Sequence, residues 1–337
     1  MLRIDQTIRE VQGLLPDTIP TAILASTEPL LLKGLVADWP IVQAGRESAA
    51  AAAEYLLRFY DDAPVGVGTG APEMAGRFFY NEDMSGLNFD SHGAKLDQVL
   101  AEILKHEHAD EAPSIYVGST AIDDCLAGFR AENDLDFGEF APLASFWLGS
   151  RSRIAAHWDL PDNVACCAVG RRRFTLFPPE ELKNLYVGPL HFTPSGREIS
   201  LVDFQDPDFV RFPKFREALN RAQVAELEPG DAVFVPSMWW HHVEGLDDFN
   251  LLVNYWWRRS PSYMGTPANA LNHAILSIRE LPREQREAWQ GIFEHYVFAA
   301  EPENFEHIPE HARGPLGPID ENTARMLRAD LLNKLNR

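Results

Sequence analysis

A histidine and an aspartate stand two residues apart near the middle of the chain, in the stretch RIAAHWDLPD. If this stretch is a strand, the side chains of His157 and Asp159 leave the same face and can converge on one ion. A histidine from a neighbouring strand would complete a set of two histidines and one carboxylate, which leaves three coordination positions open on iron(II). The spacing therefore predicts a metal site, although a single H-x-D pair on a strand usually has no such role.

Two adjacent histidines follow later in the chain, in PSMWWHHVEG, and on spacing alone either His241 or His242 could be the third ligand. A turn at LEPGD, a short apolar run at 232–235 and a bend at 236–240 precede them. We expect this turn, strand and bend to deliver one histidine to the rim of a β-barrel. The alternative is a buried pair satisfied by the backbone.

Three consecutive arginines, Arg171, Arg172 and Arg173, precede the run FTLFPP. Alternation along a strand places Arg172 on the same face as Phe174 and Leu176, which is the more uniformly apolar face. We therefore expect Arg172 to point inward, where it could bind an acidic group. The alternative is a solvated basic run.

The elements around these residues change character along the chain. Short β-rich runs separated by Gly, Pro and Asp extend from Ser114 to Trp257, a spacing that favours a β-sandwich or barrel over a parallel sheet with crossover helices. We predict three regions: a mixed α/β segment at 1–113 that packs on the barrel, a β-rich core at 114–260, and a helical region at 261–337. The apolar helices of the last region suit a homodimer.

Composition excludes several classes of partner. The chain has 50 Asp and Glu against 30 Lys and Arg, a net charge of −20, so its mean field repels DNA and anionic membranes. No apolar run is long enough to span a membrane, and acidic residues interrupt the start of the chain, where a signal peptide would be apolar. The three cysteines form no disulfide framework. We predict a cytoplasmic protein.

These motifs resemble the JmjC or cupin-like oxygenases that depend on iron(II) and 2-oxoglutarate, and most nearly the asparaginyl hydroxylases among them. The similarity is dense from Ser145 to Trp257, in HWDLPDN, GRRRFTLFPP, VDFQDPDFVRFPKF, PGDAVFVPSMWWHHVE and VNYWW. It is looser in the first third and in the helical tail. The resemblance implies a mainly β fold, a double-stranded β-helix or jelly-roll core with flanking helices and a helical C-terminal region. It also implies iron(II), 2-oxoglutarate and O₂ as cofactor and cosubstrates.

The resemblance separates the two histidines. The third metal ligand of the family is the histidine of an H-x-V pattern, which places His241 beside His157 and Asp159. His242 then points to the other face of its strand and serves as packing or as support for a ligand.

The resemblance also assigns a pocket for 2-oxoglutarate. The carboxylate-binding lysine of the relatives falls at Arg172, a departure that keeps the charge and adds a bidentate fork, so another acid could be admitted. A threonine of one relative is replaced here by Ile154, and its hydrogen bond is lost or supplied by a group such as Ser152. Residues that hydrogen-bond 2-oxoglutarate or line its pocket in the relatives match Tyr116, Asn163 and Asn254.

Four tryptophans, Trp239, Trp240, Trp256 and Trp257, are expected to be packing residues of the barrel rather than residues that stack on a substrate. Indole rings around an iron site would also keep it dry.

By resemblance, the expected activity is hydroxylation of a protein or peptide side chain, with succinate and CO₂ as coproducts. Removal of an N-methyl group proceeds through the same hydroxylation and stays open. So does an RNA-modifying hydroxylase, which a local basic patch at Arg211, Lys214 and Arg216 could serve despite the acidic mean charge. The non-enzymatic alternative is a metal-binding, cupin-like scaffold.

Overall fold

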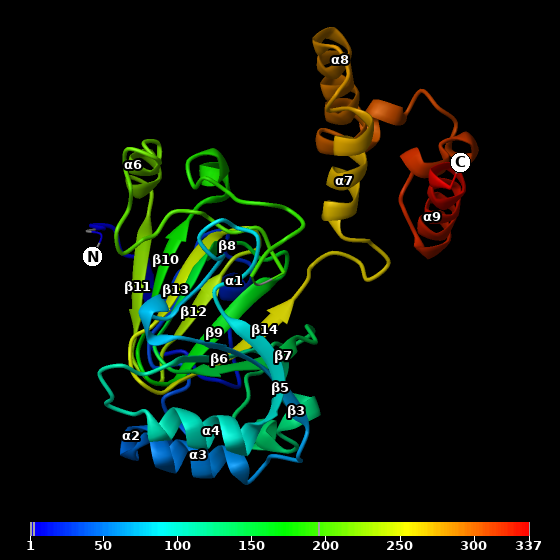
Figure 1. Ribbon diagram of the computed structural model, residues 1–337. Coiled ribbons are helices and arrows are strands. Elements are labelled where there is room, and N and C mark those ends of the chain that lie inside the picture. The colour runs from blue at the N-terminus through cyan, green and yellow to red at the C-terminus, as the bar shows by residue number, and fades with distance from the viewer. Residues whose placement is uncertain (1, 3, 195, 337) are drawn as a thin grey trace. The chain divides into compact units, whose positions relative to one another are not determined.

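The computed structural model describes residues 2, 4–194 and 196–336 of the chain. They form two compact units, Met1–Arg258 and Arg259–Arg337 (Figure 1). In the first unit two β-sheets enclose an apolar interior, and helices cover the outer side of the larger sheet.

The two sheets are mostly antiparallel. Within the described residues the larger sheet has nine strands in the order β1-β2-β12-β9-β14-β7-β6-β3-β5, and the smaller has five in the order β11-β10-β13-β8-β4. Only β1–β2 and β4–β8 are parallel pairs there. The strands of the larger sheet are β1 (Arg9–Val11), β2 (Leu30–Leu32), β3 (Pro64–Gly70), β5 (Asp90–Lys95), β6 (Ser114–Ala121), β7 (Leu143–Gly149), β9 (Asp162–Val169), β12 (Ala232–Val235) and β14 (Asn250–Trp257). Those of the smaller are β4 (Arg77–Phe78), β8 (Ser152–His157), β10 (Arg172–Phe177), β11 (Gln223–Leu227) and β13 (Trp240–Gly245).

The barrel interior, as we call the space between the sheets, is lined by alternate residues of both. In β14, Leu252 packs inward, whereas Leu251, Val253 and Tyr255 pack against the helical layer. Both faces of this strand are therefore covered, which explains its continuous apolar run. The apolar residues that meet in the barrel interior include Ala165, Cys167, Phe174, Leu176, Ala225, Leu227, Val233, Val235, Val243 and Leu252.

The helical layer comes from the N-terminal part of the chain, and Figure 1 shows α2, α3 and α4 side by side. The helical path is interrupted at Ser48, between α2 and α3. The Ser48 hydroxyl accepts a hydrogen bond from the Ala51 N–H (3.0 Å) and so caps the start of α3. The helices of the first unit are α1 (Thr21–Leu24), α2 (Pro40–Glu47), α3 (Ala49–Leu57), α4 (Leu96–Lys105), α5 (Ile122–Cys125) and α6 (Phe215–Leu219).

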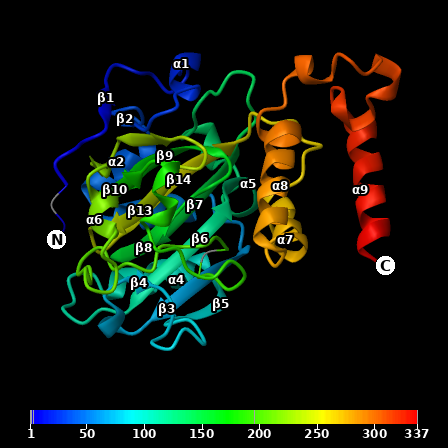
Figure 2. The same ribbon diagram turned by 90° about the horizontal axis from the view of Figure 1, so that it is seen from above.

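An excursion between β10 and β11, residues 178–222, covers the outer face of the smaller sheet. Its Phe204 and Phe215 pack with Phe177 of β10 and Trp240 of β13. Figure 2 shows β10, β13 and β8 side by side, the three strands that this excursion covers in part.

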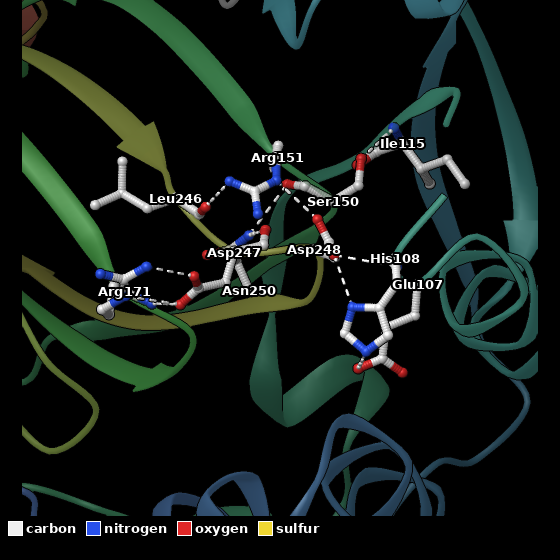
Figure 3. Close-up of polar contacts among 10 residues, drawn as sticks. All are labelled: Glu107, His108, Ile115, Ser150, Arg151, Arg171, Leu246, Asp247, Asp248 and Asn250. Atoms are coloured by element: carbon white, nitrogen blue, oxygen red, sulfur yellow. Dashed lines mark hydrogen bonds and ion pairs between the residues drawn. The ribbon is translucent and has the colours of Figure 1, made fainter. Parts of the chain in front are cut away.

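Ion pairs tie together the hairpin turns at the end of the barrel opposite His157 and His241 (Figure 3). Arg171 donates to Asp247 through its backbone N–H (2.8 Å) and its guanidinium (2.9 Å). Asp248 accepts from Arg151 Nε (2.7 Å) and from the His108 backbone N–H (3.1 Å). These contacts fix the β9–β10 and β13–β14 turns against the neighbouring loops.

The second unit is helical, with α7 (Pro267–Ser277), α8 (Arg283–Phe293), a π-helical turn (Glu294–Phe298) and α9 (Glu321–Leu335). Among its described residues, Phe305 and Ala324 are the buried apolar side chains. Across the described part of the chain, no helix has the length and apolar character needed to cross a bilayer. The predicted fold class, a jelly-roll core with flanking helices and C-terminal helices, is confirmed.

Candidate metal centre and barrel interior

Two histidines and an aspartate meet at one end of the barrel. His157, the last residue of β8, pairs directly with His241 of β13, and their ring centroids are 4.3 Å apart. Asp159 Oδ2 lies 3.6 Å from His241 Nε2. One ligand atom from each of these three residues lies within 4.8 Å of the others, so the three side chains converge on one point.

The position of Asp159 relative to strand β8 differs from the prediction. We expected a strand to carry both His157 and Asp159, but β8 ends at His157 and Asp159 lies in the loop that follows. This loop is fixed by the bend before β13, because the Met238 N–H donates to the Asp159 carbonyl (2.8 Å) and Ser237 Oγ donates to the Leu160 carbonyl (2.6 Å). Strand alternation is therefore the wrong reason for the convergence.

An irregularity in β8 sets the direction of His157. On β13, His241 and Val243 lie two positions apart, whereas their partners His157 and Ile154 lie three positions apart, so β8 contains one extra residue. Ile154 packs toward the barrel interior, and the bulge lets His157 face it as well. Ser152 pairs with Gly245 at the far end of β8, away from His157.

Hydrogen bonds assign the tautomers of both histidines. His157 Nδ1 lies 2.9 Å from the Ala155 carbonyl and His241 Nδ1 lies 3.0 Å from the Trp239 carbonyl. A carbonyl oxygen only accepts, so each Nδ1 carries the hydrogen and each Nε2 keeps its lone pair. Two imidazole lone pairs and a carboxylate then point at one another without a proton between them, an arrangement that a cation stabilises. These residues fit a metal ion.

Burial keeps His241 neutral. Loss of solvent, and next the charge of His157, lower the pKa of His241 to about 4, although Asp159 acts in the other direction. A neutral imidazole is the form that binds a metal.

His242 faces the other way. Its ring stacks on Phe204 of the excursion at 4.5 Å, and burial, followed by the charge of Arg153, lowers the pKa of His242 to about 3. Its Nδ1 has no hydrogen-bond partner and lies 4.0 Å from Glu244 Oε2. The two adjacent histidines therefore lie on opposite faces of β13.

Arg172 points into the barrel interior and is 1% exposed. Among the described residues its Nε has no hydrogen-bond partner, and the groups that act on its charge are Tyr116 and Cys167 rather than a carboxylate. Burial lowers the pKa of Arg172, while the nearby Tyr116 and Cys167 raise it. A guanidinium nonetheless stays charged in proteins, so the barrel interior contains a cation without a protein counter-ion.

The other predicted pocket residues also face the interior. Burial raises the pKa of the Tyr116 hydroxyl, and the charge of Arg172 lowers it in part, which places the two side chains near each other. Asn254 accepts from Trp147 Nε1 (2.7 Å) and donates to Asn163 Oδ1 (3.4 Å). These two hydrogen bonds fix the side chain of Asn254 and orient Trp147 and Asn163 beside it.

Two interior groups were not predicted. Ser145 Oγ and Trp256 Nε1 are buried and have no hydrogen-bond partner. The pattern VNYWW does not single out Trp256, because its two adjacent tryptophans are equivalent in sequence. In the structure Trp257 packs on the helical layer and Trp256 does not. Ser145, within SFWLG, carried no signal beyond strand alternation.

Comparison with known proteins agrees with this architecture. The profile of the cupin-like domain family matches residues 16–263, which include the described strands of both sheets except β1. The chain belongs to the cupin-like domain family. The resemblance to JmjC-type proteins is thereby supported at the level of the superfamily, whereas the closer likeness to asparaginyl hydroxylases stays a prediction.

Several family relatives cover part of the chain. Lysine-specific demethylase JMJ31 of Arabidopsis thaliana is 33% identical over 115 residues, which are 34% of this chain and 20% of the relative. Human HSPB1-associated protein 1 is 32% identical over 154 residues, 43% of this chain and 30% of the relative. Human tRNA wybutosine-synthesizing protein 5 is 25% identical over 238 residues, 61% of this chain and 72% of the relative. The chain therefore spans less than a third of the first two relatives.

Proposed function

We propose that this protein is an iron(II)- and 2-oxoglutarate-dependent oxygenase that hydroxylates a protein or peptide side chain. The observation that carries the proposal is the unpaired guanidinium of Arg172, in the same barrel as the converging His157, Asp159 and His241. Burial of a guanidinium without a counter-ion destabilises the protein unless an anion binds beside it, so the site fits a ligand with a carboxylate. A scaffold without a ligand has no use for both features.

The register of β10 and β13 gives the approximate length of that ligand. His241 pairs with Leu176 and Gly245 pairs with Arg172, so the two functional side chains start four residues apart along the ladder. Four residues span roughly 13 Å, part of which the imidazole and guanidinium groups fill themselves. A five-carbon dicarboxylate suits the remaining distance, with one end at the metal and the other at Arg172.

Each residue has a separate role in this proposal. His157, Asp159 and His241 hold the metal, Arg172 binds the far carboxylate, and the interior residues Tyr116, Asn163 and Asn254 contact the cosubstrate. When bound, iron(II) with 2-oxoglutarate and O₂ supplies the oxidation of a C–H bond, with succinate and CO₂ as coproducts. The apolar interior excludes water from the reacting atoms.

The decisive experiment measures succinate formation and O₂ use by the iron-loaded protein, with and without a candidate substrate. We expect the two rates to be coupled and both to be lost in the variants His157→Ala and Asp159→Ala. Parallel assays with other 2-oxo acids show whether Arg172 selects 2-oxoglutarate. If the iron-loaded protein neither binds nor consumes 2-oxoglutarate, the protein is a cupin-like scaffold rather than an oxygenase.

The substrate class rests on the relatives, one of which is named as a lysine-specific demethylase and another as a protein associated with HSPB1. Removal of an N-methyl group begins with hydroxylation of its C–H bond, so demethylation of a protein uses the same site. Proteins trapped on the metal-substituted enzyme can be incubated with the iron-loaded enzyme, 2-oxoglutarate and O₂ and then analysed by mass spectrometry. They should gain one oxygen atom if hydroxylated or lose a methyl group if demethylated.

A second candidate is hydroxylation of RNA, which one observation favours: the tRNA wybutosine-synthesizing relative matches over 72% of its own length. On the excursion, Arg216 stacks over Phe209 (3.9 Å) and Arg211 over Phe212 (5.0 Å), which gives a local basic and aromatic surface. The net charge of −20 opposes polyanion binding. Salt-sensitive binding of transfer RNA would favour this candidate over a protein substrate.

We propose that the protein is a homodimer through its C-terminal helices. The described residues of the second unit bury little apolar surface of their own, and a second copy offers a self-complementary face. The large apolar side chains that this unit exposes include Leu271, Leu276, Trp289, Ile292, Tyr296, Val297, Phe298, Met326, Leu327, Leu331, Leu332 and Leu335.

We also propose a cytoplasmic location. The three cysteines, Cys125, Cys166 and Cys167, are free and buried, and burial raises the pKa of each thiol, which keeps it unreactive. Localisation of a tagged full-length chain by microscopy tests this.

A further inference from the structure

Two polar groups remain without partners on the inner face of the larger sheet, and they lie on adjacent strands. Ser145 of β7 pairs with Asn254 of β14, and Trp256 of β14 pairs with Leu143 of β7. Ser145 is 1% exposed, and both Ser145 Oγ and Trp256 Nε1 are buried without a hydrogen bond. A buried polar group without a hydrogen bond destabilises the folded protein, so each of these two groups calls for a partner outside the described residues.

The described neighbours of Trp256 do not accept a hydrogen bond from its indole N–H. Trp147 donates to Asn254 Oδ1, and Asn254 donates to Asn163 Oδ1, so both amide oxygens already accept hydrogen bonds from other groups. Trp147 also packs edge-on against Trp256, with ring centroids 5.8 Å apart and planes at 83°, and so limits the orientation of the indole. The N–H is held in place and can only donate.

The position of Trp256 identifies which end of a ligand it would meet. Trp256 pairs with Asn163, the second residue of β9, and β9 begins shortly after the loop that contains Asp159. Trp256 therefore lies at the end of the barrel that carries the converging His157, Asp159 and His241 side chains. Arg172 lies at the opposite end, four residues along β10 from the partner of His241.

We propose that Trp256 Nε1–H and Ser145 Oγ–H are donors to the 2-oxo acid, and that they bind the carboxylate next to its keto group. This inference rests on the proposed function, because it takes the 2-oxo acid as the ligand. Arg172 then binds one carboxylate of the cosubstrate, and the pair formed by Trp256 and Ser145 binds the other. The two donors are positioning and specificity residues, and they are separate from the metal ligands.

The test measures the affinity of the full-length protein for 2-oxoglutarate by calorimetry, with Mn(II) in place of iron and no primary substrate. Trp256→Phe removes the N–H and keeps an aromatic ring, and Ser145→Ala removes a single oxygen atom. We expect Trp256→Phe to weaken 2-oxoglutarate binding by about ten-fold or more, since a hydrogen bond to a charged acceptor is the stronger kind, and Ser145→Ala to weaken it measurably. The affinity for Mn(II) alone should not change in either variant.

A matched control is available in the adjacent residue. Trp257 Nε1 is also buried without a partner, but its ring packs on the helical layer against Phe137 (5.1 Å) and Phe234 (6.0 Å). Trp257→Phe should therefore leave 2-oxoglutarate affinity unchanged. The same loss in Trp257→Phe as in Trp256→Phe would overturn the inference, because removal of any indole would then suffice.

The outcomes separate this inference from the proposed function. If the unaltered protein with Mn(II) does not bind 2-oxoglutarate, the proposed function fails. If it binds 2-oxoglutarate and Trp256→Phe binds it equally well, only the role of Trp256 fails. If Trp256→Phe does not fold, as thermal unfolding would show, Ser145→Ala decides: a measurable loss of affinity supports the donor pair, and unchanged affinity overturns it.

Discussion

At the scale of single residues, the burial of Arg172 is costly to the ligand-free protein. A cation that is 1% exposed, with no carboxylate partner in the described residues, loses its hydration without compensation. Such a residue lowers the free energy of unfolding of the ligand-free protein and raises the affinity for a ligand, and these two effects can be measured separately.

Arg172→Met tests this trade. Methionine fills a similar volume without a charge, so we expect the free energy of unfolding of the ligand-free protein to rise by about 1–4 kcal/mol. The affinity for 2-oxoglutarate should fall by about 100-fold, because a charge-assisted pair of hydrogen bonds is lost. Chemical denaturation and calorimetry give the two numbers.

The neighbouring Arg173 provides the control for Arg172→Met. Arg173 lies on the other face of β10 and donates to Glu226 Oε1 (2.8 Å). Arg173→Met should leave 2-oxoglutarate affinity unchanged. If Arg172→Met also retained full affinity, the interior cation would have a different ligand.

The two histidines of β13 give a second prediction at this scale. His241→Ala should weaken metal binding by more than about 100-fold and abolish turnover, because it removes a lone pair that points at Asp159. His242→Ala should retain the metal and only reduce turnover, because this ring packs on Phe204. Metal titration of both variants is the measurement. The reverse order of affinities would mean that the register of β13 is shifted by one residue.

At the scale of elements, the hairpin turns drawn in Figure 3 depend on paired charges, Arg171 with Asp247 and Arg151 with Asp248. Burial alone would raise the pKa of Asp248, but hydrogen bonds from Arg151 and from the His108 backbone outweigh it and lower the pKa below its ordinary value of 3.8. A carboxyl group with a depressed pKa in the folded state stabilises the protein above its unfolded pKa, and this contribution is lost as the pH falls through the folded pKa.

Asp248→Asn should therefore lower the free energy of unfolding at neutral pH by up to about 1 kcal/mol, since the pair with Arg151 is partly exposed. The difference from the unaltered protein should shrink as the pH falls below about 4, because protonation of Asp248 then removes the same contacts. Denaturation curves at several pH values measure this. A difference that persists at low pH would indicate that packing, rather than charge, accounts for the effect.

Much of the element pattern could be predicted from the sequence, and particular failures have physical causes. The Ala-rich, Leu-spaced run over 47–60 predicts one helix, and α3 (Ala49–Leu57) lies there, capped by Ser48. The pattern does not predict the separate helix α2 (Pro40–Glu47) before it. The apolar run PLLLKGLVA over 29–37 predicts a longer strand than β2, Leu30–Leu32. The strand ends there because the chain turns where Asp231 accepts from the Gly34 N–H (2.9 Å) and pairs with Lys33 (2.6 Å). Such contacts with distant residues leave no trace in local periodicity.

At the scale of the whole molecule, the proposed homodimer can be tested on α9. Leu331 and Leu332 are 44% and 60% exposed, and a charge at either would be buried in a dimer interface. Leu331→Asp or Leu332→Asp should convert the dimer to a monomer with unchanged helical content, as judged by light scattering and circular dichroism. Asn333→Asp, which adds the same charge one residue on, serves as the control. A monomeric unaltered protein would refute the dimer.

The sequence by itself determined which residues could do chemistry: the H-x-D pair and the two histidines follow from residue types and spacing, and the inward Arg172 follows from the two-residue period of a strand. The tertiary structure decided how they meet. The extra residue in β8 turns His157 inward, the bend at Met238 fixes the loop of Asp159, and cross-strand packing distinguishes Trp256 from Trp257. The reason is that alternation is local, whereas register, bulges and hydrogen-bond partners depend on residues far apart in the chain.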